Sequence, residues 1–92
     1  MIRSFASKDA KALFEGSRIR RWSRIETVAM RKLAMLNRAA RLDDLRIPPS
    51  NRLEALKGDR AGQYSIRVND QYRVVFAWSK GDAYLVDIVD YH

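Results

Sequence analysis

Residues 63–89 read QYSIRVNDQYRVVFAWSKGDAYLVDIV, and this stretch decides the fold. Apolar side chains occupy every second position along residues 64–68 and again along residues 72–78. A period of two indicates β-strands, whose successive side chains point to opposite faces of a sheet. Asn69 and Asp70 lie between the two runs and tolerate the positive φ of a tight turn, so we expect a two-residue hairpin there.

Two further strands are expected on either side of this hairpin. Residues 79–82 around Gly81 predict a second tight turn, and a returning strand is expected from about residue 83 through residue 89 to the end of the sequence. An earlier short strand is predicted at residues 52–56, and the loop 57–62 joins it to the hairpin. The carboxyl-terminal half therefore predicts an antiparallel sheet built from hairpins.

The amino-terminal half changes to a helical period after a possible short edge strand at residues 1–5. Ser7 is a good N-cap for a first helix, and Gly16 is expected just beyond its end. Ser23 and Glu26 fit the capping box S-x-x-E, which predicts the start of a second helix. The apolar stripe of this second helix consists of Ile25, Ala29, Leu33, Leu36 and Ala40.

The predicted elements combine into an α+β fold. A short helical turn at residues 42–45 is opened by an acidic pair, and Pro48 and Pro49 prevent any continuation of the helical half. Helices that precede an antiparallel sheet are expected to pack on one of its faces. With 92 residues and 10.7 kDa, we expect a single domain over residues 1–92.

Composition excludes several classes of protein. The chain has no Cys and one His, which excludes disulfide scaffolds, thiol nucleophiles and zinc–thiolate sites, and argues against a metal centre. Its longest apolar run, residues 74–78, is far too short to span a bilayer, and residues 1–16 lack the apolar core of a signal peptide. We therefore expect a soluble, cytoplasmic protein without a bound cofactor.

Positive charge is concentrated in the first half of the chain. Residues 1–46 carry twelve Lys and Arg against five acids, whereas residues 47–92 carry six of each, so the first half accounts for the net charge of +7. Arg24, Arg31 and Arg38 recur every seven residues and predict a basic ridge along the second helix. Two interpretations stay open here: a solvated helix face, or a surface that follows the phosphates of a nucleic acid.

The remaining titratable residues suggest proton transfer beside a phosphate. The segment KGDRAG at residues 57–62 lacks the spacing of a nucleotide-binding loop, and the carboxylates are not grouped for a divalent ion. RNA carries its own nucleophile in the 2′-hydroxyl, so a protein that cleaves it needs a base, an acid and cations near the phosphate. The candidates for these roles are Asp90, Tyr91, His92, Lys57 and Arg73.

Each candidate also has a purely structural interpretation. Residues 90–92 would form an ordinary polar tail, and Arg73 would pair across the strands with a carboxylate such as Asp87. Strand alternation is expected to place Asp90 and His92 on one face. We expect Trp78 in the core, whereas for Trp22 core packing and base stacking are equally compatible with the sequence.

Five segments resemble HigB-type toxins of the RelE/ParE superfamily. They are MIRSF, LFEG, RLEALKGDRAG, YSIRVNDQYRVVF and the terminal GDAYLVDIVDYH, and together they cover most of the chain. The resemblance implies a compact RelE-like fold and a ribosome-dependent, metal-free endoribonuclease that cleaves mRNA in the A site. It also implies a HigA-like helix-turn-helix antitoxin, which neutralises the toxin and through which alone the complex contacts operator DNA.

The resemblance also assigns roles to individual residues. It implies that Asp90, Tyr91 and His92 form the catalytic end, and that Lys57 and Arg73 bind and neutralise phosphate. Glu54 stands where some members carry a His, and a carboxylate can act as a base but does not donate a proton at neutral pH. In the ribosomal setting, the ridge of Arg24, Arg31 and Arg38 is expected to contact ribosomal RNA.

Two other functions remain open from the sequence. ParE-like members of the same superfamily inhibit DNA gyrase by binding and lack a nuclease site, because one fold supports several functions. A basic nucleic-acid-binding module with neither activity is the third possibility, and it would need no titratable cluster.

Overall fold

Four antiparallel strands form one sheet in the order β1-β2-β3-β4, so each strand pairs with its neighbour in the chain. The computed structural model describes residues 1–91. The strands are β1 (Glu54–Ala55), β2 (Gln63–Arg67), β3 (Tyr72–Ser79) and β4 (Asp82–Asp90), and the helices are α1 (Lys8–Phe14) and α2 (Glu26–Arg38). Short 3₁₀ turns lie at η1 (Arg20–Trp22), η2 (Leu42–Arg46), η3 (Pro49–Asn51) and η4 (Gly58–Arg60). The predicted α+β fold is confirmed.

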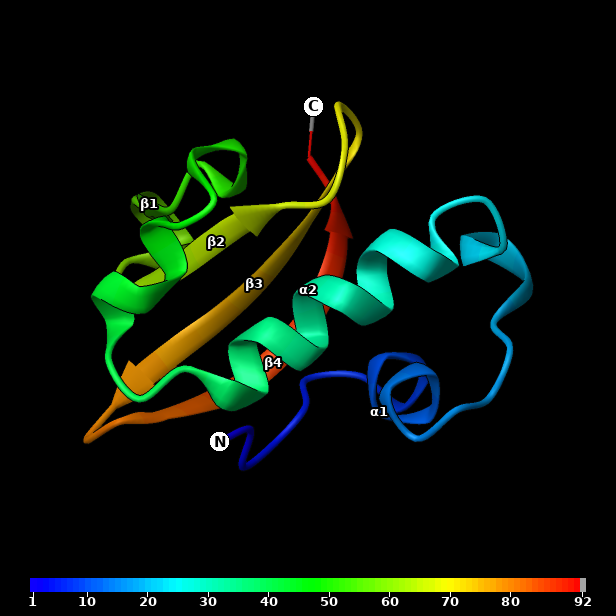
Figure 1. Cartoon of the computed structure of the whole chain (residues 1–92), viewed down its shortest axis with the longest axis horizontal. Coiled ribbons are helices and arrows are strands. Elements are labelled where there is room, and N and C mark those ends of the chain that lie inside the picture. The colour runs from blue at the N-terminus through cyan, green and yellow to red at the C-terminus, as the bar shows by residue number, and fades with distance from the viewer. Residues whose placement is uncertain (92) are drawn as a thin grey trace.

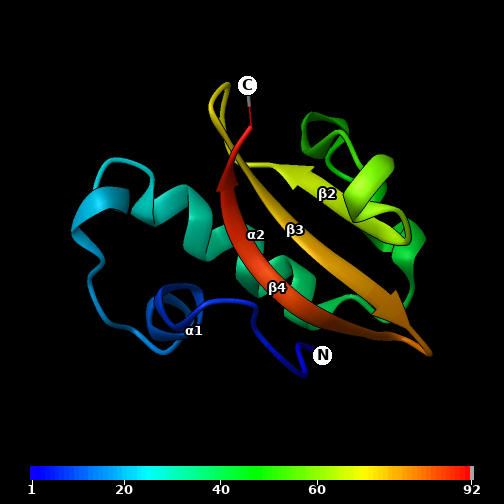
Figure 2. The ribbon, with the colours of Figure 1, turned by 180° about the vertical axis from the view of Figure 1, so that it is seen from behind.

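The main core lies between α2 and one face of the sheet (Figure 1). Leu33 and Leu36 of α2 are fully buried there, as are Val74 and Phe76 of β3. Trp22 is 2% exposed and belongs to the same core, which settles the choice left open by the sequence in favour of packing. The opposite face of the sheet carries neither α-helix (Figure 2).

Strand β4 contains an irregularity that changes which of its residues are buried. The pairing between β3 and β4 shifts register between Val75 and Ala77, and Leu85 adopts a left-handed φ of 55°. Leu85 is consequently 49% exposed, while Val86 is fully buried. A bulge of this kind interrupts the alternation of a strand and bends it.

The bulge lets the amino-terminal segment dock along β4. The amide of Leu85 donates to Oγ of Ser4 at 2.9 Å, and the amide of Val86 donates to the carbonyl of Ser4 at 3.1 Å. The expected edge strand at residues 1–5 is therefore present only as two isolated parallel bridges, Ile2 with Ala83 and Phe5 with Val86. This segment covers the β4 edge of the sheet (Figure 2).

The start of α1 matches its prediction, whereas both ends of α2 differ from theirs. Oγ of Ser7 accepts a hydrogen bond from the amide of Ala10 at 3.1 Å, as an N-cap should. The predicted capping box at Ser23 is wrong: α2 begins at Glu26, its N-cap is Ile25, and no side chain caps it. Burial of Trp22 explains the difference, because the chain enters a 3₁₀ turn there and Ser23 ends that turn. At the other end, Ala39 is buried in place of the predicted Ala40.

Local backbone conformation and hydrogen bonds determine the length of the first hairpin loop and of β1. The prediction of a two-residue turn at Asn69–Asp70 is wrong, because the loop includes Gln71 as well. Oδ1 of Asn69 accepts hydrogen bonds from the amides of Gln71 and Tyr72 at 2.9 and 2.7 Å, which holds the longer loop. The second turn forms as predicted, with positive φ at Lys80 and Gly81. Strand β1 is shorter than predicted because Arg52 is left-handed, with φ of 46°.

A buried lysine joins α2 to the segment that leads into β1. Nζ of Lys32 donates to Oδ1 of Asn51 at 2.6 Å, and both residues are buried. Nδ2 of Asn51 donates in turn to the carbonyl of Leu45 at 3.1 Å. Burial lowers the pKa of Lys32 below its ordinary value of 10.5, and the charges of Arg31 and Arg67 lower it further.

The lowered pKa of Lys32 predicts how stability depends on pH. As pH rises through the folded-state pKa, the native amine becomes neutral while the unfolded chain still binds the proton, so raising pH favours the native state. We expect the free energy of unfolding of the native sequence, relative to Lys32→Met, to increase between pH 7 and about pH 10. Urea unfolding of both proteins at the two pH values measures this difference, and a constant or falling difference would contradict it.

Candidate functional site

Arg73 is a buried cation on the face of the sheet opposite the α2 core. It alternates along β3 with the core residues Val74 and Phe76, so its side chain points to the opposite face. The residue is 8% exposed. Its Nη1 donates to Oε1 of Glu54 at 3.0 Å, and its Nη2 donates to the carbonyl of Arg52 at 2.6 Å. Its Nε is buried and has no hydrogen-bond partner among the described residues.

Tyr91 completes a cluster of three predicted site residues. Cζ of Arg73 lies 5.5 Å from the centre of the Tyr91 ring, within the range of a cation–π contact. The amide of Tyr91 donates to the carbonyl of Gln71 at 2.6 Å, which fixes the backbone just beyond β4. Tyr91 is 46% exposed, so its ring stands between the buried guanidinium and solvent. Glu54, Arg73 and Tyr91 are called the Arg73 cluster below.

Asp90, the other described residue of the predicted catalytic end, is not part of this cluster. Asp90 pairs directly with Tyr72 in the sheet, so its side chain starts from the face opposite that of Arg73. One of its carboxylate oxygens accepts a hydrogen bond from Nε2 of Gln71 at 3.0 Å. His92 lies outside the described residues, so its expected position beside Asp90 stays a prediction.

The structural interpretation of Arg73 is right in kind but names the wrong acid. Asp87 is opposite Val75 in the sheet and accepts a hydrogen bond from Oγ of Ser7 at 2.8 Å. Glu54 reaches Arg73 instead, because β1 pairs with β2 so that Glu54 is opposite Ser65. The carbonyl of Arg52 is a further partner that side-chain patterns could not reveal.

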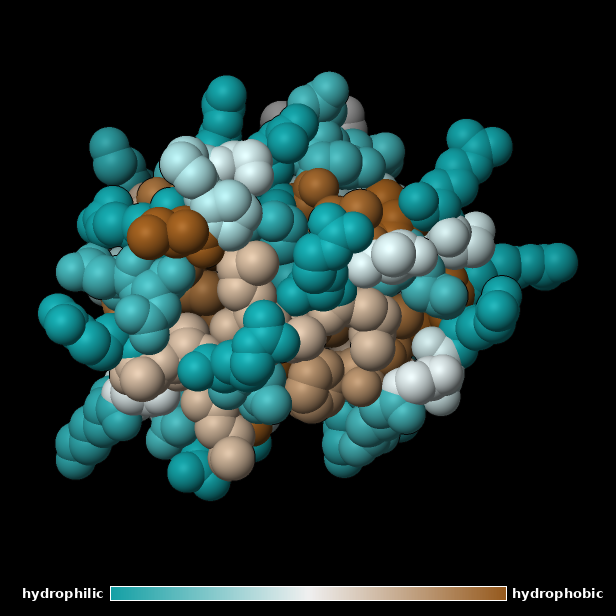
Figure 3. Space-filling model, viewed as in Figure 1, coloured by the Kyte–Doolittle hydropathy of each residue, from teal (hydrophilic) through white to brown (hydrophobic). Residues whose placement is uncertain are grey.

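The remaining predicted cations are exposed and lie on other segments. Lys57 precedes η4, is exposed, and forms no hydrogen bond or ion pair with the Arg73 cluster. Arg31 and Arg38 are exposed on α2. Arg24 lies in the turn before α2, so the predicted three-residue helical ridge reduces to two helical positions and one turn residue. On the face that carries α2, long hydrophilic side chains project around a less polar centre (Figure 3).

The Arg73 cluster has the chemical groups to bind a phosphodiester. A guanidinium with an unpartnered N–H donor suits a phosphate oxygen, and its burial reduces competition from water. Tyr91 brings a phenol and Glu54 a carboxylate to the same guanidinium. Ser65 lies on β2, on the same face of the sheet as Arg73. It is fully buried, and its Oγ likewise has no hydrogen-bond partner among residues 1–91. Sequence reasoning missed Ser65, because one serine in an alternating strand carries no signal.

A polar hollow of about 480 Å³ lies on the side of the sheet that carries α2. It lies between the turns that precede α2 and the β2–β3 loop, and we call it the arginine hollow. Its lining residues are Arg20, Arg21, Ser23, Arg24, Ile25, Asn69, Gln71 and Tyr72. Gln71 connects it to the strand end, because its carbonyl binds the amide of Tyr91.

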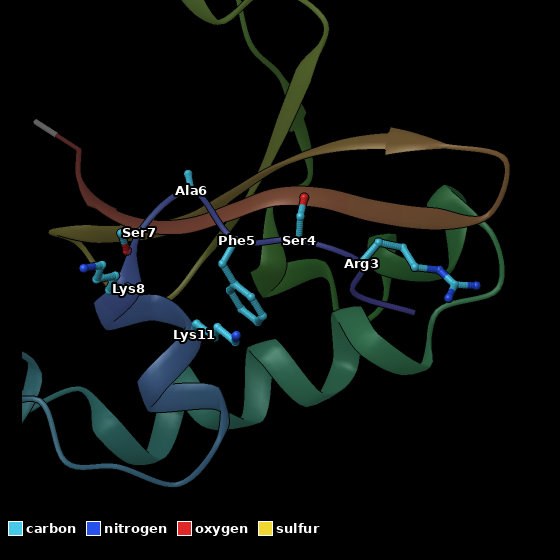
Figure 4. Close-up of a pocket in the computed structure, with 7 residues that line it drawn as sticks. All are labelled: Arg3, Ser4, Phe5, Ala6, Ser7, Lys8 and Lys11. Atoms are coloured by element: carbon cyan, nitrogen blue, oxygen red, sulfur yellow. The ribbon is translucent and has the colours of Figure 1, made fainter.

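A second hollow, of about 470 Å³, is found along the amino-terminal segment. Its lining residues, drawn in Figure 4, are Arg3, Ser4, Phe5, Ala6, Ser7, Lys8 and Lys11. It contains none of the predicted site residues. Within residues 1–91, no three His, Asp or Glu side chains gather as potential metal ligands, and no helix is long and apolar enough to cross a membrane.

Comparison with known sequences connects these features to one protein family. Residues 3–92 match the HigB-like toxins, described as the RelE-like toxin of the type II toxin-antitoxin system HigB. The chain is 35% identical to Endoribonuclease HigB of Proteus vulgaris over the full length of both proteins. It is 52% identical to Toxin HigB-1 of Vibrio cholerae over 61 residues, which cover 66% of this chain and 64% of that protein.

Solved structures show the same fold at low sequence identity. The YoeB-YefM complex from Staphylococcus aureus contains a chain with a TM-score of 0.62 and 17% identity, and the match covers 100% of this chain and 98% of that one. A YoeB/ParE toxin from Agrobacterium tumefaciens gives a TM-score of 0.57 at 20% identity, covering 99% of this chain and 98% of that one. The fold is therefore that of this group of toxins.

The geometry of Arg73 predicts the effect of changing its acidic partner. Glu54→Ala should lower the free energy of unfolding by about 1–2 kcal/mol, since a buried donor of Arg73 loses its acceptor. Glu54→Gln keeps an oxygen acceptor and should retain most of that free energy. Urea unfolding followed by circular dichroism compares the two variants with the native sequence. Equal losses in both would show that the charge of Glu54, and not the hydrogen bond, matters.

Proposed function

We propose that this chain, which belongs to the HigB-like family of RelE-like toxins in type II toxin-antitoxin systems, is an endoribonuclease that cleaves mRNA in the ribosomal A site. Family membership gives the class of toxin. The name of the Proteus vulgaris relative, Endoribonuclease HigB, supports the chemistry. Cleavage on the ribosome, and inhibition of translation as its result, are our extension of that chemistry.

The observation that carries the proposal is the Arg73 cluster. Arg73 is 8% exposed and its buried Nε has no hydrogen-bond partner among the described residues, so a phosphate oxygen that gained access to this atom would complete the bonding of the cation. Tyr91 lies over this guanidinium, and it is also one of the residues to which the family resemblance assigns catalysis. A binding-only toxin has no evident need for a buried, incompletely bonded guanidinium next to a titratable phenol.

The proposed mechanism combines the Arg73 cluster with the roles that the family resemblance implies for Lys57, Asp90 and His92. The 2′-hydroxyl of the message attacks the adjacent phosphorus, and the bond to the 5′-oxygen of the next nucleotide breaks. Arg73 and Lys57 stabilise the charge that develops on the phosphate oxygens. His92 and Tyr91 transfer the protons, and Asp90 orients a neighbouring group. Glu54 acts mainly as a positioning residue, because its carboxylate already binds Nη1 of Arg73. No step uses a metal ion or cofactor.

The partners follow from the same family membership. We propose that a HigA-like helix-turn-helix antitoxin binds and neutralises the toxin, and that the toxin approaches operator DNA only within that complex. The structural neighbour from Staphylococcus aureus is a complex of YoeB with YefM, which supports pairing of this fold with a second protein. The other partners in this proposal are the 70S ribosome and its mRNA.

Cleavage of programmed ribosomes tests the proposal. The purified protein is added to ribosomes carrying a message and to the same message alone, and primer extension maps the 5′ ends. We expect cuts in phase with the codons only when ribosomes are present. His92→Ala and Tyr91→Phe should each slow cleavage about a hundred-fold or more, since proton transfer contributes that much to such reactions.

Two results would contradict the proposal. Cleavage within a few-fold of the native rate in both variants would show that His92 and Tyr91 do not transfer the protons. The absence of cuts in either reaction would favour a binding role, and a DNA gyrase supercoiling assay would then test the ParE-like alternative. Lys80→Ala serves as the control, because Lys80 lies in the β3–β4 turn at the other end of these strands.

The exposed arginines of α2 predict the salt dependence of ribosome binding. Arg31→Gln with Arg38→Gln should weaken binding to 70S ribosomes and lower the slope of log Kd against log salt by about one to two, because each phosphate contact releases counterions. Sedimentation at several salt concentrations measures both quantities. Unchanged affinity and slope would show that this helix face is only a solvated surface.

A further inference from the structure

We propose that the arginine hollow binds a backbone phosphate of single-stranded RNA at a position separate from the Arg73 cluster. This inference rests on the proposed function and deepens it, since it gives the substrate a second contact outside the Arg73 cluster. The hollow draws together two segments that are far apart in the chain, residues 20–25 and residues 69–72. Its volume of about 480 Å³ is in the range of small-molecule sites, large enough for a nucleotide.

The charges around the hollow favour an anion. None of its eight lining residues is acidic, and three of them are arginines. Arg21 is already engaged, because Nη1 binds Oδ2 of Asp9 at 2.9 Å and its guanidinium lies 4.4 Å from the centre of the Trp22 ring. Arg20 and Arg24 are exposed and have no ion pair or hydrogen bond from their side chains among residues 1–91. These two guanidinium groups therefore supply uncompensated positive charge.

The loop on the other side of the hollow contributes neutral donors. Oδ1 of Asn69 is occupied by the amides of Gln71 and Tyr72, which leaves its Nδ2 group as a donor. The side-chain amide of Gln71 is already engaged, because its Nε2 donates to Oδ2 of Asp90. A phosphate held here would receive charged bonds from the arginines and a neutral bond from the amide of Asn69.

Gln71 relates the hollow to the site of cleavage. Its side chain lines the hollow, and its carbonyl accepts the hydrogen bond from the amide of Tyr91, whose ring covers Arg73. The hollow and the Arg73 cluster therefore lie at the same end of β3 and β4 but on opposite faces of the sheet, because Tyr72 lines the hollow and its side chain points away from that of Arg73.

Arg24 thus has a different role from the one expected of it as part of a helical ridge. It lies in the turn before α2 and lines the hollow, whereas Arg31 and Arg38 lie on the helix and do not. The chain consequently offers a matched pair of double variants. Arg20→Gln with Arg24→Gln removes two charges from the hollow, and Lys8→Gln with Lys11→Gln, the control variant, removes the same charge from the second hollow, which contains none of the proposed site residues.

Binding of a short RNA that cannot react tests the inference directly. The probe is a single-stranded tetranucleotide with 2′-O-methyl groups, which lacks the attacking hydroxyl, titrated at low salt and followed by amide NMR shifts. We expect shifts at residues 20–24 and 69–72. The hollow variant should bind about ten-fold more weakly, with a salt slope lower by about one, while the control variant stays within about two-fold of the native protein.

Three outcomes would overturn the inference. The first is unchanged affinity for the tetranucleotide in the hollow variant, and the second is an equal loss of affinity in both double variants. The third is a hollow variant that loses affinity for ribosomes in sedimentation but not for the tetranucleotide, which would assign the hollow to ribosomal RNA. Both double variants retain Arg21 and Trp22. Near-ultraviolet circular dichroism, which reports the packing of aromatic side chains such as Trp22, therefore verifies that each variant is folded. Because no turnover is measured, a protein that binds the probe through the hollow but never cleaves RNA would uphold this inference and refute the proposed nuclease.

Discussion

A buried guanidinium sets the main constraint on this structure. A charge removed from water must find hydrogen-bond acceptors, or it destabilises the fold by several kcal/mol. Arg73 finds a carboxylate on β1 and a carbonyl just before it, and the ring of Tyr91 approaches it from the end of β4. One cation thereby holds together an edge strand, a central strand and the segment that follows the last strand.

The acceptors of Arg73 are themselves held in place from the helical layer. Arg52 itself adopts the left-handed conformation at the end of η3, and this directs its carbonyl toward Arg73. The preceding Asn51 accepts a hydrogen bond from Lys32 of α2. Helix α2 thus contributes a buried polar contact to the segment that carries Glu54, in addition to its apolar face. The open face of the sheet and the helix-covered face are connected through a short series of hydrogen bonds, and the geometry around Arg73 depends on both.

The periods of the sequence were sufficient to predict the helices, the last three strands and the packing of helices on the sheet. They could not predict the bulge at Leu85, since this depends on hydrogen bonds to Ser4 from 81 residues away. The capping box at Ser23 failed because burial of Trp22 outweighs a local capping preference. At the candidate site, the sequence proposed both Arg73 and Tyr91, which the structure brings into contact, but the choice of Glu54 over Asp87 depends on the register of a two-residue strand.

The docking of the amino-terminal segment on β4 has a consequence for how the chain folds during synthesis. Ile2 and Phe5 pair with Ala83 and Val86, so a segment that is made early waits for one that is made about 81 residues later. Such long-range contacts form late, because the intervening chain must first be ordered. A nascent chain therefore has an incomplete sheet edge and no Tyr91 over Arg73. The protein can acquire its finished site only after β4 and Tyr91 have been synthesised.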